Sequence, residues 1–173
     1  DDEIISTRQA IEWFNLESIG KSPARMDYKK LDNLNGHYIR ETPDAVLAAE
    51  LVGFAERQTP PLVLDAKARA RLEGAMSALK ERAKTLLELL QGAEFLFTDG
   101  PRVLDEAAQK LLTAQARQGL AKTLPLLEAT DWSAPALEAA AREHAESSGQ
   151  KLGQAAQALR AALTGRASSP PLF

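Results

Sequence analysis

Residues 65–90 read DAKARARLEGAMSALKERAKTLLELL, and this stretch indicates the fold class. Most of it consists of Ala, Leu, Arg, Lys and Glu, which favour helices, and its apolar residues recur at helical spacing. Asp65 can cap the first helix, because its carboxylate can accept hydrogen bonds from N–H groups of the first turn. Gly74 weakens that helix near its middle, by about 1 kcal/mol relative to Ala where it is exposed. A second helix is predicted over about 79–90, so the stretch favours consecutive helices without a strand.

The helical periodicity continues in both directions from this stretch. Ser6 and Asp27 are predicted N-caps, Pro43 stands where a helix can begin, and Gly165 stands where a helix C-cap glycine belongs. No strand pattern is present, so the chain is predicted to be all-α, built of tandem small helical domains. The other predicted helices cover about 7–14, 28–40, a segment after Pro43, 104–112, 113–128 with a kink at Pro125, 136–146 capped by Ser133, and 152–164.

Two breaks divide the helical pattern. Residues 59–61 (TPP) end a helix, because proline cannot continue one and also restricts the residue before it. Residues 95–101 (FLFTDGP) form the sharper break, and a domain boundary is predicted near them. A chain of 173 residues suits one mid-sized domain or two small ones.

The composition excludes several classes of protein. With 45% hydrophobic and 26% charged residues, the chain is neither a disordered tail nor a fibre. Because it has no cysteine, a disulfide scaffold, a thiolate metal site and a Cys nucleophile are excluded. No membrane span or secretory signal is recognisable.

The sequence also lacks recognisable catalytic motifs. His37 and His144 lack metal-ligand spacing, and no phosphate-binding glycine loop or nucleophile motif is present, so a self-contained enzyme is disfavoured. His144 is predicted to be a surface residue. Trp13 and Trp132 are predicted to be core or interface anchors.

The distribution of charge is more informative than its total. Lys and Arg are concentrated in residues 21–40, 66–84 and 151–173, whereas the remainder is mildly acidic and the formal net charge is −3. A protein that binds a polyanion through a basic face would show this pattern. The alternative is that the helices segregate charge by chance.

Residues 26–40 (MDYKKLDNLNGHYIR) resemble a signature of bacterial glutamyl-tRNA synthetases. Further stretches match the family in the same order along the chain, so the resemblance covers essentially all of it. These stretches are 10–14 (AIEWF), 20–25 (GKSPAR), 80–86 (KERAKTL), 95–97 (FLF), 151–154 (KLGQ), 159–165 (LRAALTG) and 169–173 (SPPLF).

The resemblance implies three units and a function. Residues 1–42 would be the end of a stem-contact region, and residues 43–94 and 95–173 the two anticodon-binding helical domains of an α-helical cage. The chain would be the tRNA-binding, anticodon-recognising C-terminal part of a cytoplasmic, monomeric glutamate–tRNA ligase whose partner is glutamate tRNA. The parent enzyme would use ATP and Mg²⁺, but its catalytic signatures would lie upstream, so this part would bind no cofactor. The alternative left open is a helical protein-interaction scaffold that binds no RNA.

The resemblance also implies roles for individual residues. Arg82 takes the position that reads the third anticodon base, a cytosine, since a guanidinium donates to the acceptors on the pairing edge of cytosine. The alternative for Arg82 is an ordinary surface pair with Glu81 or Glu88. Around the first anticodon base the family pattern places Arg160, Ser169, Pro170 and Leu172, although Pro171 lacks the N–H donor of the glycine that many relatives carry there. The resemblance assigns contacts with the tRNA stem and its phosphates to Lys30, Asn35, His37, Arg40 and Lys151.

Overall fold

The computed structural model describes residues 4–23, 25–149 and 151–172. Over these residues the regular structure is helical and no strand forms, which confirms the all-α prediction. The α-helices are α1 (Thr7–Trp13), α2 (Tyr28–Glu41), α3 (Asp44–Glu56), α4 (Ala66–Lys80), α5 (Leu86–Ala93), α6 (Glu106–Leu111), α7 (Ala114–Glu128), α8 (Ala134–Ser147) and α9 (Leu152–Thr164), and a 3-10 helix, η1, covers Glu94–Leu96.

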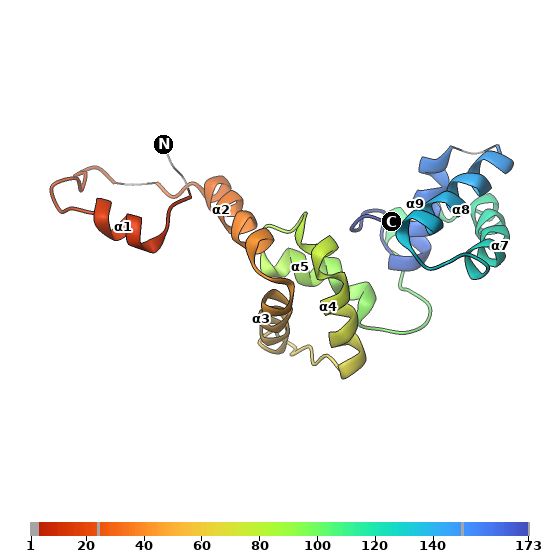
Figure 1. Ribbon diagram of the computed structural model, residues 1–173, viewed down its shortest axis with the longest axis horizontal. Coiled ribbons are helices and arrows are strands. Elements are labelled where there is room, and N and C mark those ends of the chain that lie inside the picture. The colour runs from red at the N-terminus through yellow and green to blue at the C-terminus, as the bar shows by residue number, and fades with distance from the viewer. Residues whose placement is uncertain (1–3, 24, 150, 173) are drawn as a thin grey trace.

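The helices follow one another along an elongated molecule (Figure 1). The segment with α1 lies at one end, α3, α4 and α5 form the middle, and α7, α8 and α9 lie at the other end. In the described part of the chain, no helix has the length and apolar character needed to cross a membrane. Ala24 and Phe173, which belong to motifs quoted above, lie outside the described residues.

Most predicted caps are present. Ser6 forms a capping box with Gln9, Asp27 accepts from the N–H groups of Lys29 and Lys30, and Asp65 accepts from that of Ala68. Gly165 ends α9 with a φ of 75°, in the left-handed region that favours glycine. Ser133 precedes α8, but its side chain makes no capping hydrogen bond.

The predicted helix over 79–90 has the wrong start. The first helix continues to Lys80, and the next begins only at Leu86. Thr85 caps α5 by accepting from the N–H of Glu88 at 3.1 Å, while the Glu88 carboxylate accepts from the N–H of Lys84 at 2.8 Å. These reciprocal bonds stabilise a helix start at this place, so residues 81–85 form a turn instead of a helix.

The larger hydrophobic core lies between α3, α4 and α5. Its fully buried side chains stand at helical spacing on their helices, so that each helix presents one apolar face to the others. The largest of them are Leu47, Leu51, Leu72, Met76 and Leu89. Ile39 of α2 joins this core, which attaches the end of α2 to the middle part of the molecule.

The second core is smaller and is built mainly from alanines. Ala108 of α6 packs with Ala158 and Ala161 of α9, and Leu112 completes the buried set. Short side chains allow these helices to approach closely, but they bury little apolar area. This part of the molecule therefore depends more on backbone geometry than the first part does.

Several aromatic residues are more exposed than predicted. Trp13 is 54% exposed and Trp132 is 77% exposed, so of the two predicted roles, core or interface anchor, the core role is wrong for both. Tyr38 is 46% exposed and its hydroxyl donates to the carbonyl of Ile5. The short helix α1 buries none of its residues, so Trp13 has no core to join.

The linker between the two cores is held by ion pairs. Lys67 and Arg71 of α4 each place a nitrogen 2.7 Å from a carboxylate oxygen of Asp99. The hydrogen bonds from Lys67 and then Arg71 lower the pKa of Asp99 from 3.8 to about 2. Arg102 donates to Thr98 within the linker and to the carbonyl of Leu163 in α9, which connects the linker to the second core.

Replacement of Gly165 by Ala is expected to destabilise the second core by about 2 kcal/mol or more. A non-glycine residue is strained at this φ, and the new Cβ would collide with the carbonyl oxygen of Val103. Urea unfolding followed by circular dichroism measures the effect. Gly153→Ala is the matched control on the same helix, because a Cβ there meets nothing within 4 Å. Equal effects of the two substitutions would contradict this account of Gly165.

The pKa of Asp99 gives a prediction about pH. Because the folded-state pKa lies below 3.8, the stabilisation from its ion pairs is complete above about pH 4 and is lost as pH falls through about 2. A carboxyl NMR titration should therefore find a pKa near 2 for Asp99. Lys67→Ala should raise that pKa toward 3.8, whereas Lys122→Ala on α7 should leave it unchanged. A pKa of 3.8 for Asp99 in the unmodified chain would disprove its ion pairs with Lys67 and Arg71.

Candidate nucleic-acid interface

The turn between α4 and α5 meets the C-terminal tail. Arg82 projects from the turn, and its Nη1 donates to the carbonyl oxygen of Ser169 at 3.3 Å. Arg160 of α9 donates from Nε to the Ser169 hydroxyl at 3.0 Å, and that hydroxyl donates to the carbonyl of Pro170 at 2.9 Å. Four of the predicted anticodon-site residues, which come from two distant parts of the sequence, therefore meet at Ser169.

The structure does not support an ordinary surface pair for Arg82. Glu88 is engaged by the backbone N–H of Lys84, and within the described chain no acidic side chain lies within ion-pair distance of Arg82. A guanidinium carries five N–H donors in a fixed plane, and the bond to Ser169 uses one of them. The remaining donors can therefore face a ligand while the tail fixes the orientation of the plane.

The turn that carries Arg82 is itself fixed from several directions. Asn35 of α2 donates from Nδ2 to the carbonyl of Lys84 at 2.5 Å. A Cβ at Gly36 would lie 3.5 Å from the Cα of Lys84, which shows how closely α2 and the turn approach each other. Lys80, at the start of the turn, donates to the carbonyl of Thr42 at 3.0 Å and lies 2.6 Å from Asp44 Oδ1.

A cleft of about 260 Å³ opens beside Ser169. One wall comes from α5 and η1 and includes Gln91 and the half-buried ring of Phe95, and the other comes from the segment after α9. Arg166 from that segment forms an ion pair with Glu94 at the end of α5, which joins the two walls. A ring face, an amide and a guanidinium are groups that bind unstacked nucleobases.

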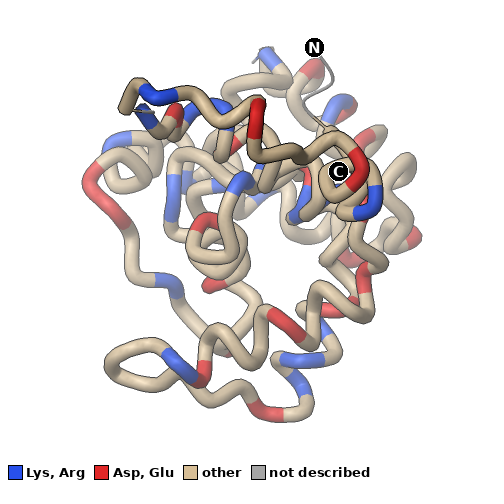
Figure 2. Tube along the Cα trace, turned by 90° about the vertical axis from the view of Figure 1, so that its left-hand side faces the viewer, with Lys and Arg blue, Asp and Glu red and all other residues tan. Residues whose placement is uncertain are grey.

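Most basic residues of the segment 66–84 form ion pairs within the protein. Lys67 and Arg71 pair with Asp99, Arg69 with Glu56, and Lys80 with Asp44. Within the described residues, Arg82 and Lys84 are the members of this segment without an acidic partner. In Figure 2, basic and acidic residues are both spread over the trace. Ion pairs within the protein therefore account for most of the basic residues in this segment, so their clustering does not by itself indicate a binding face.

The residues predicted to contact the stem are not all brought together. Lys30 lines a separate cleft of about 450 Å³ with Arg25 and Met26 near the start of α2. His37 places Nε2 3.2 Å from a Glu41 carboxylate oxygen one turn later. Arg40 is exposed near the end of the same helix.

The remaining predicted positions are distributed around α9. Lys151 precedes its first turn, whereas Ser169 follows its last, and a helix of this length is about 20 Å long. Lys151 therefore lies far from the junction at Ser169. Leu172 is half-buried in the same tail as Pro170, and Pro171 between them is exposed.

Sequence reasoning missed two features of this region. His144 is 6% exposed, so the prediction of a surface residue is wrong. Its spacing from the buried Ala141 and Ala145 places it on the inward face of α8, and that spacing was the signal available in the sequence. The pairing of Arg166 with Glu94 has no such signal, because the two residues are 72 positions apart.

The chain is similar to known proteins in sequence and in fold. Residues 46–173 match the family described as anticodon binding domain. The whole chain is 49% identical to a glutamate–tRNA ligase of Azorhizobium caulinodans and 51% identical to glutamate–tRNA ligase 1 of a Methylobacterium species. It spans 38% of the length of each of these curated relatives.

A solved structure extends the comparison to three dimensions. A glutamate tRNA ligase from Elizabethkingia meningosepticum, crystallised in complex with its amino acid, matches 99% of this chain with a TM-score of 0.75. The match covers 33% of that protein at 22% identity, so it shows a shared fold. Because the family match covers residues 46–173, which is well over half of the chain and includes the junction at Ser169, the chain belongs to the anticodon-binding domain family.

Proposed function

We propose that this chain is the part of a glutamate–tRNA ligase that binds glutamate tRNA and recognises its anticodon. The observation that carries the proposal is the junction where Arg82 and Arg160 converge on Ser169 beside a cleft. The similarity to curated glutamate–tRNA ligases at about half identity supports the same assignment. In this proposal residues 43–94 and 95–173 are the two anticodon-binding domains, and residues 1–42 are the end of the stem-contact region.

Arg82 reads the third anticodon base in this proposal. Once unstacked, a cytosine presents acceptors on its pairing edge, and these match the donors that Arg82 does not give to Ser169. A guanine at that position presents donors to the same group, so two sets of N–H groups would face each other. Because the turn and the tail both hold Arg82, the guanidinium cannot easily move away from the wrong base.

The tail reads the first anticodon base. Leu172 packs against the face of the base, while Ser169 and the backbone around Pro170 bind its edge, and Arg160 holds Ser169 in place. Pro171 has no N–H group, so backbone donation to the RNA has to come from its neighbours.

The stem-side residues set the position of the RNA. Lys30, Arg40 and Lys151 neutralise phosphates, and His37 and Asn35 add contacts to the sugar–phosphate backbone or support the helix that makes them. These contacts orient the tRNA without reading its sequence.

We assign the ligation chemistry to the remainder of the parent enzyme. Within the described residues no group of three His, Cys, Asp or Glu side chains could hold a metal ion. The proposal places the parent enzyme in the cytoplasm and treats it as a monomer. A helical scaffold that binds no RNA is the competing function, and no feature of the junction favours it.

Substitution of Arg82 tests the reading of the third anticodon base. The unmodified chain should prefer glutamate tRNA over a copy with guanine at that base by roughly tenfold to a hundredfold, as expected for loss of a good base contact. Arg82→Ala should abolish this preference in a binding titration. Arg142→Ala on α8 is the control, because it removes one exposed guanidinium away from the junction and should leave the preference intact.

Two outcomes would contradict the proposal in different ways. A preference that survives in Arg82→Ala would remove the role of Arg82 but keep the RNA-binding function. Absence of binding to both tRNAs at low salt would instead favour the scaffold function for the isolated chain.

The salt dependence of binding tests the phosphate contacts. Each lost phosphate contact should reduce the slope of log Kd against log salt concentration by about 1. Arg40→Ala and Lys151→Ala should therefore each lower the slope by that amount and weaken the binding of both tRNAs equally. A slope unchanged from that of the unmodified chain would show that the substituted residue does not contact a phosphate.

A further inference from the structure

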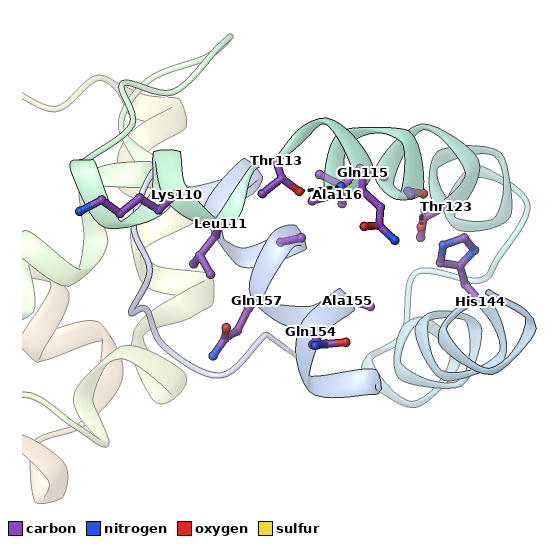
Figure 3. A pocket seen from close by; sticks show the side chains of 13 residues that line it. Lys110, Leu111, Thr113, Gln115, Ala116, Thr123, His144, Gln154, Ala155 and Gln157 are labelled. Atoms are coloured by element: carbon purple, nitrogen blue, oxygen red, sulfur yellow. Dashed lines mark hydrogen bonds between the residues drawn. The ribbon is translucent and has the colours of Figure 1, made fainter. Parts of the chain in front are cut away.

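A further cavity lies away from the junction at Ser169. It has a volume of about 460 Å³ and opens between α6, α7, α8 and α9 in the C-terminal half of the chain. Figure 3 shows Gln115 and Thr123 of α7 and His144 of α8 pointing into this space, with Ala155 of α9 across from them. Cavities of this volume commonly hold small organic molecules. No role in the proposed anticodon function accounts for it.

His144 is the unusual residue of the cavity. Its side chain is more than nine-tenths buried, yet no described residue forms a hydrogen bond with its imidazole nitrogens. The ring borders the cavity, so its nitrogens are open to a hydrogen-bond partner that enters the cavity.

The lining of the cavity combines apolar residues with a few polar groups. The apolar part comes from Ala116, Gly119 and Leu120 of α7, Ala155 and Ala158 of α9, and Leu111. Gln115 and Gln154 each offer a donor and an acceptor, and the Thr123 hydroxyl, which donates to the carbonyl of Gly119, can still accept.

The charges around the cavity limit the ligand class. Among the residues that line it, Lys110 is the one charged side chain, and Glu106 already lies 2.7 Å from its ammonium group. A polyphosphate would need several cations, and a free amino acid would need a carboxylate for its ammonium group. A neutral molecule with donors and acceptors on its edge fits this lining, and nucleobases have that chemistry.

We propose that the cavity between α6, α7, α8 and α9 is a binding site for a nucleobase, with His144 and Gln115 hydrogen-bonded to its edge. The base could belong to a free nucleoside or to an unstacked nucleotide of a bound RNA. The proposal does not depend on anticodon reading, because the cavity shares no residue with the cleft beside Ser169.

NMR of the histidine rings tests the site in the intact chain. The chain has two histidines, so a spectrum of His37→Gln assigns the signals of His144. Adenosine, cytidine, uridine and a short single-stranded RNA are titrated separately, and the His144 ring signals should shift in a saturable manner. Gln115→Leu should weaken this binding roughly threefold to tenfold, the value of one hydrogen bond. Gln118→Leu is the matched control, an exposed glutamine of the same helix that does not line the cavity.

The outcomes separate the two sources and can overturn the proposal. Shifts with nucleosides identify a site for free nucleosides, and shifts with RNA alone identify a site for a base of bound RNA. The proposal is wrong if neither ligand shifts His144, or if Gln115→Leu binds as tightly as Gln118→Leu. Larger shifts with glutamine or inorganic phosphate than with nucleosides would also overturn the ligand class. Loss of tRNA binding with retained nucleoside shifts would contradict only the proposed anticodon function.

Discussion

The turn at residues 81–85 is held between helices that belong to different parts of the molecule. Asn35 of α2 binds its backbone, Lys80 attaches its start to the junction of α2 and α3, and Glu88 of α5 closes its end. Each partner is rigid because its own helix packs into the first core. Arg82 therefore projects in one direction, and the C-terminal tail can form a bond to it at Ser169.

The contacts between the two cores are polar and few, in contrast with the apolar packing inside each core. Asp99 receives two cations from α4, Arg166 pairs with Glu94, and Arg82 binds the tail. Exposed ion pairs of this kind contribute little stability individually. They do fix the direction of approach, because each one requires a particular pair of charged atoms to meet. In the proposed function this geometry matters more than stability, because the RNA-binding groups have to be held in position.

Much of the fold was predictable from the sequence, and the errors have different causes. The caps at Ser6, Asp27 and Asp65 were correct because capping joins residues three positions apart or fewer. The start of α5 was misplaced because residues 79–85 also have good helix propensity, and reciprocal bonds around Thr85 outweighed it. Trp13 failed as a core residue because nothing packs over α1. For the candidate site, the resemblance located Arg82, Arg160 and Ser169, but their common meeting point could not be derived from spacing.

The sequence by itself determined the helices, most of their ends and the two apolar faces that become the cores, since these properties depend on neighbours within one or two turns. Gly165 illustrates this, because a glycine after an amphipathic run specifies a helix end before any tertiary contact is known. Only the tertiary structure decided which basic residue pairs with which acidic residue. Lys67 and Arg71 look like RNA-binding residues in the sequence, yet they bind Asp99 some 30 positions away. Burial of His144 was likewise decided by the packing of α8 against α7 and α9, because exposure depends on what covers a helix face and not on the face alone.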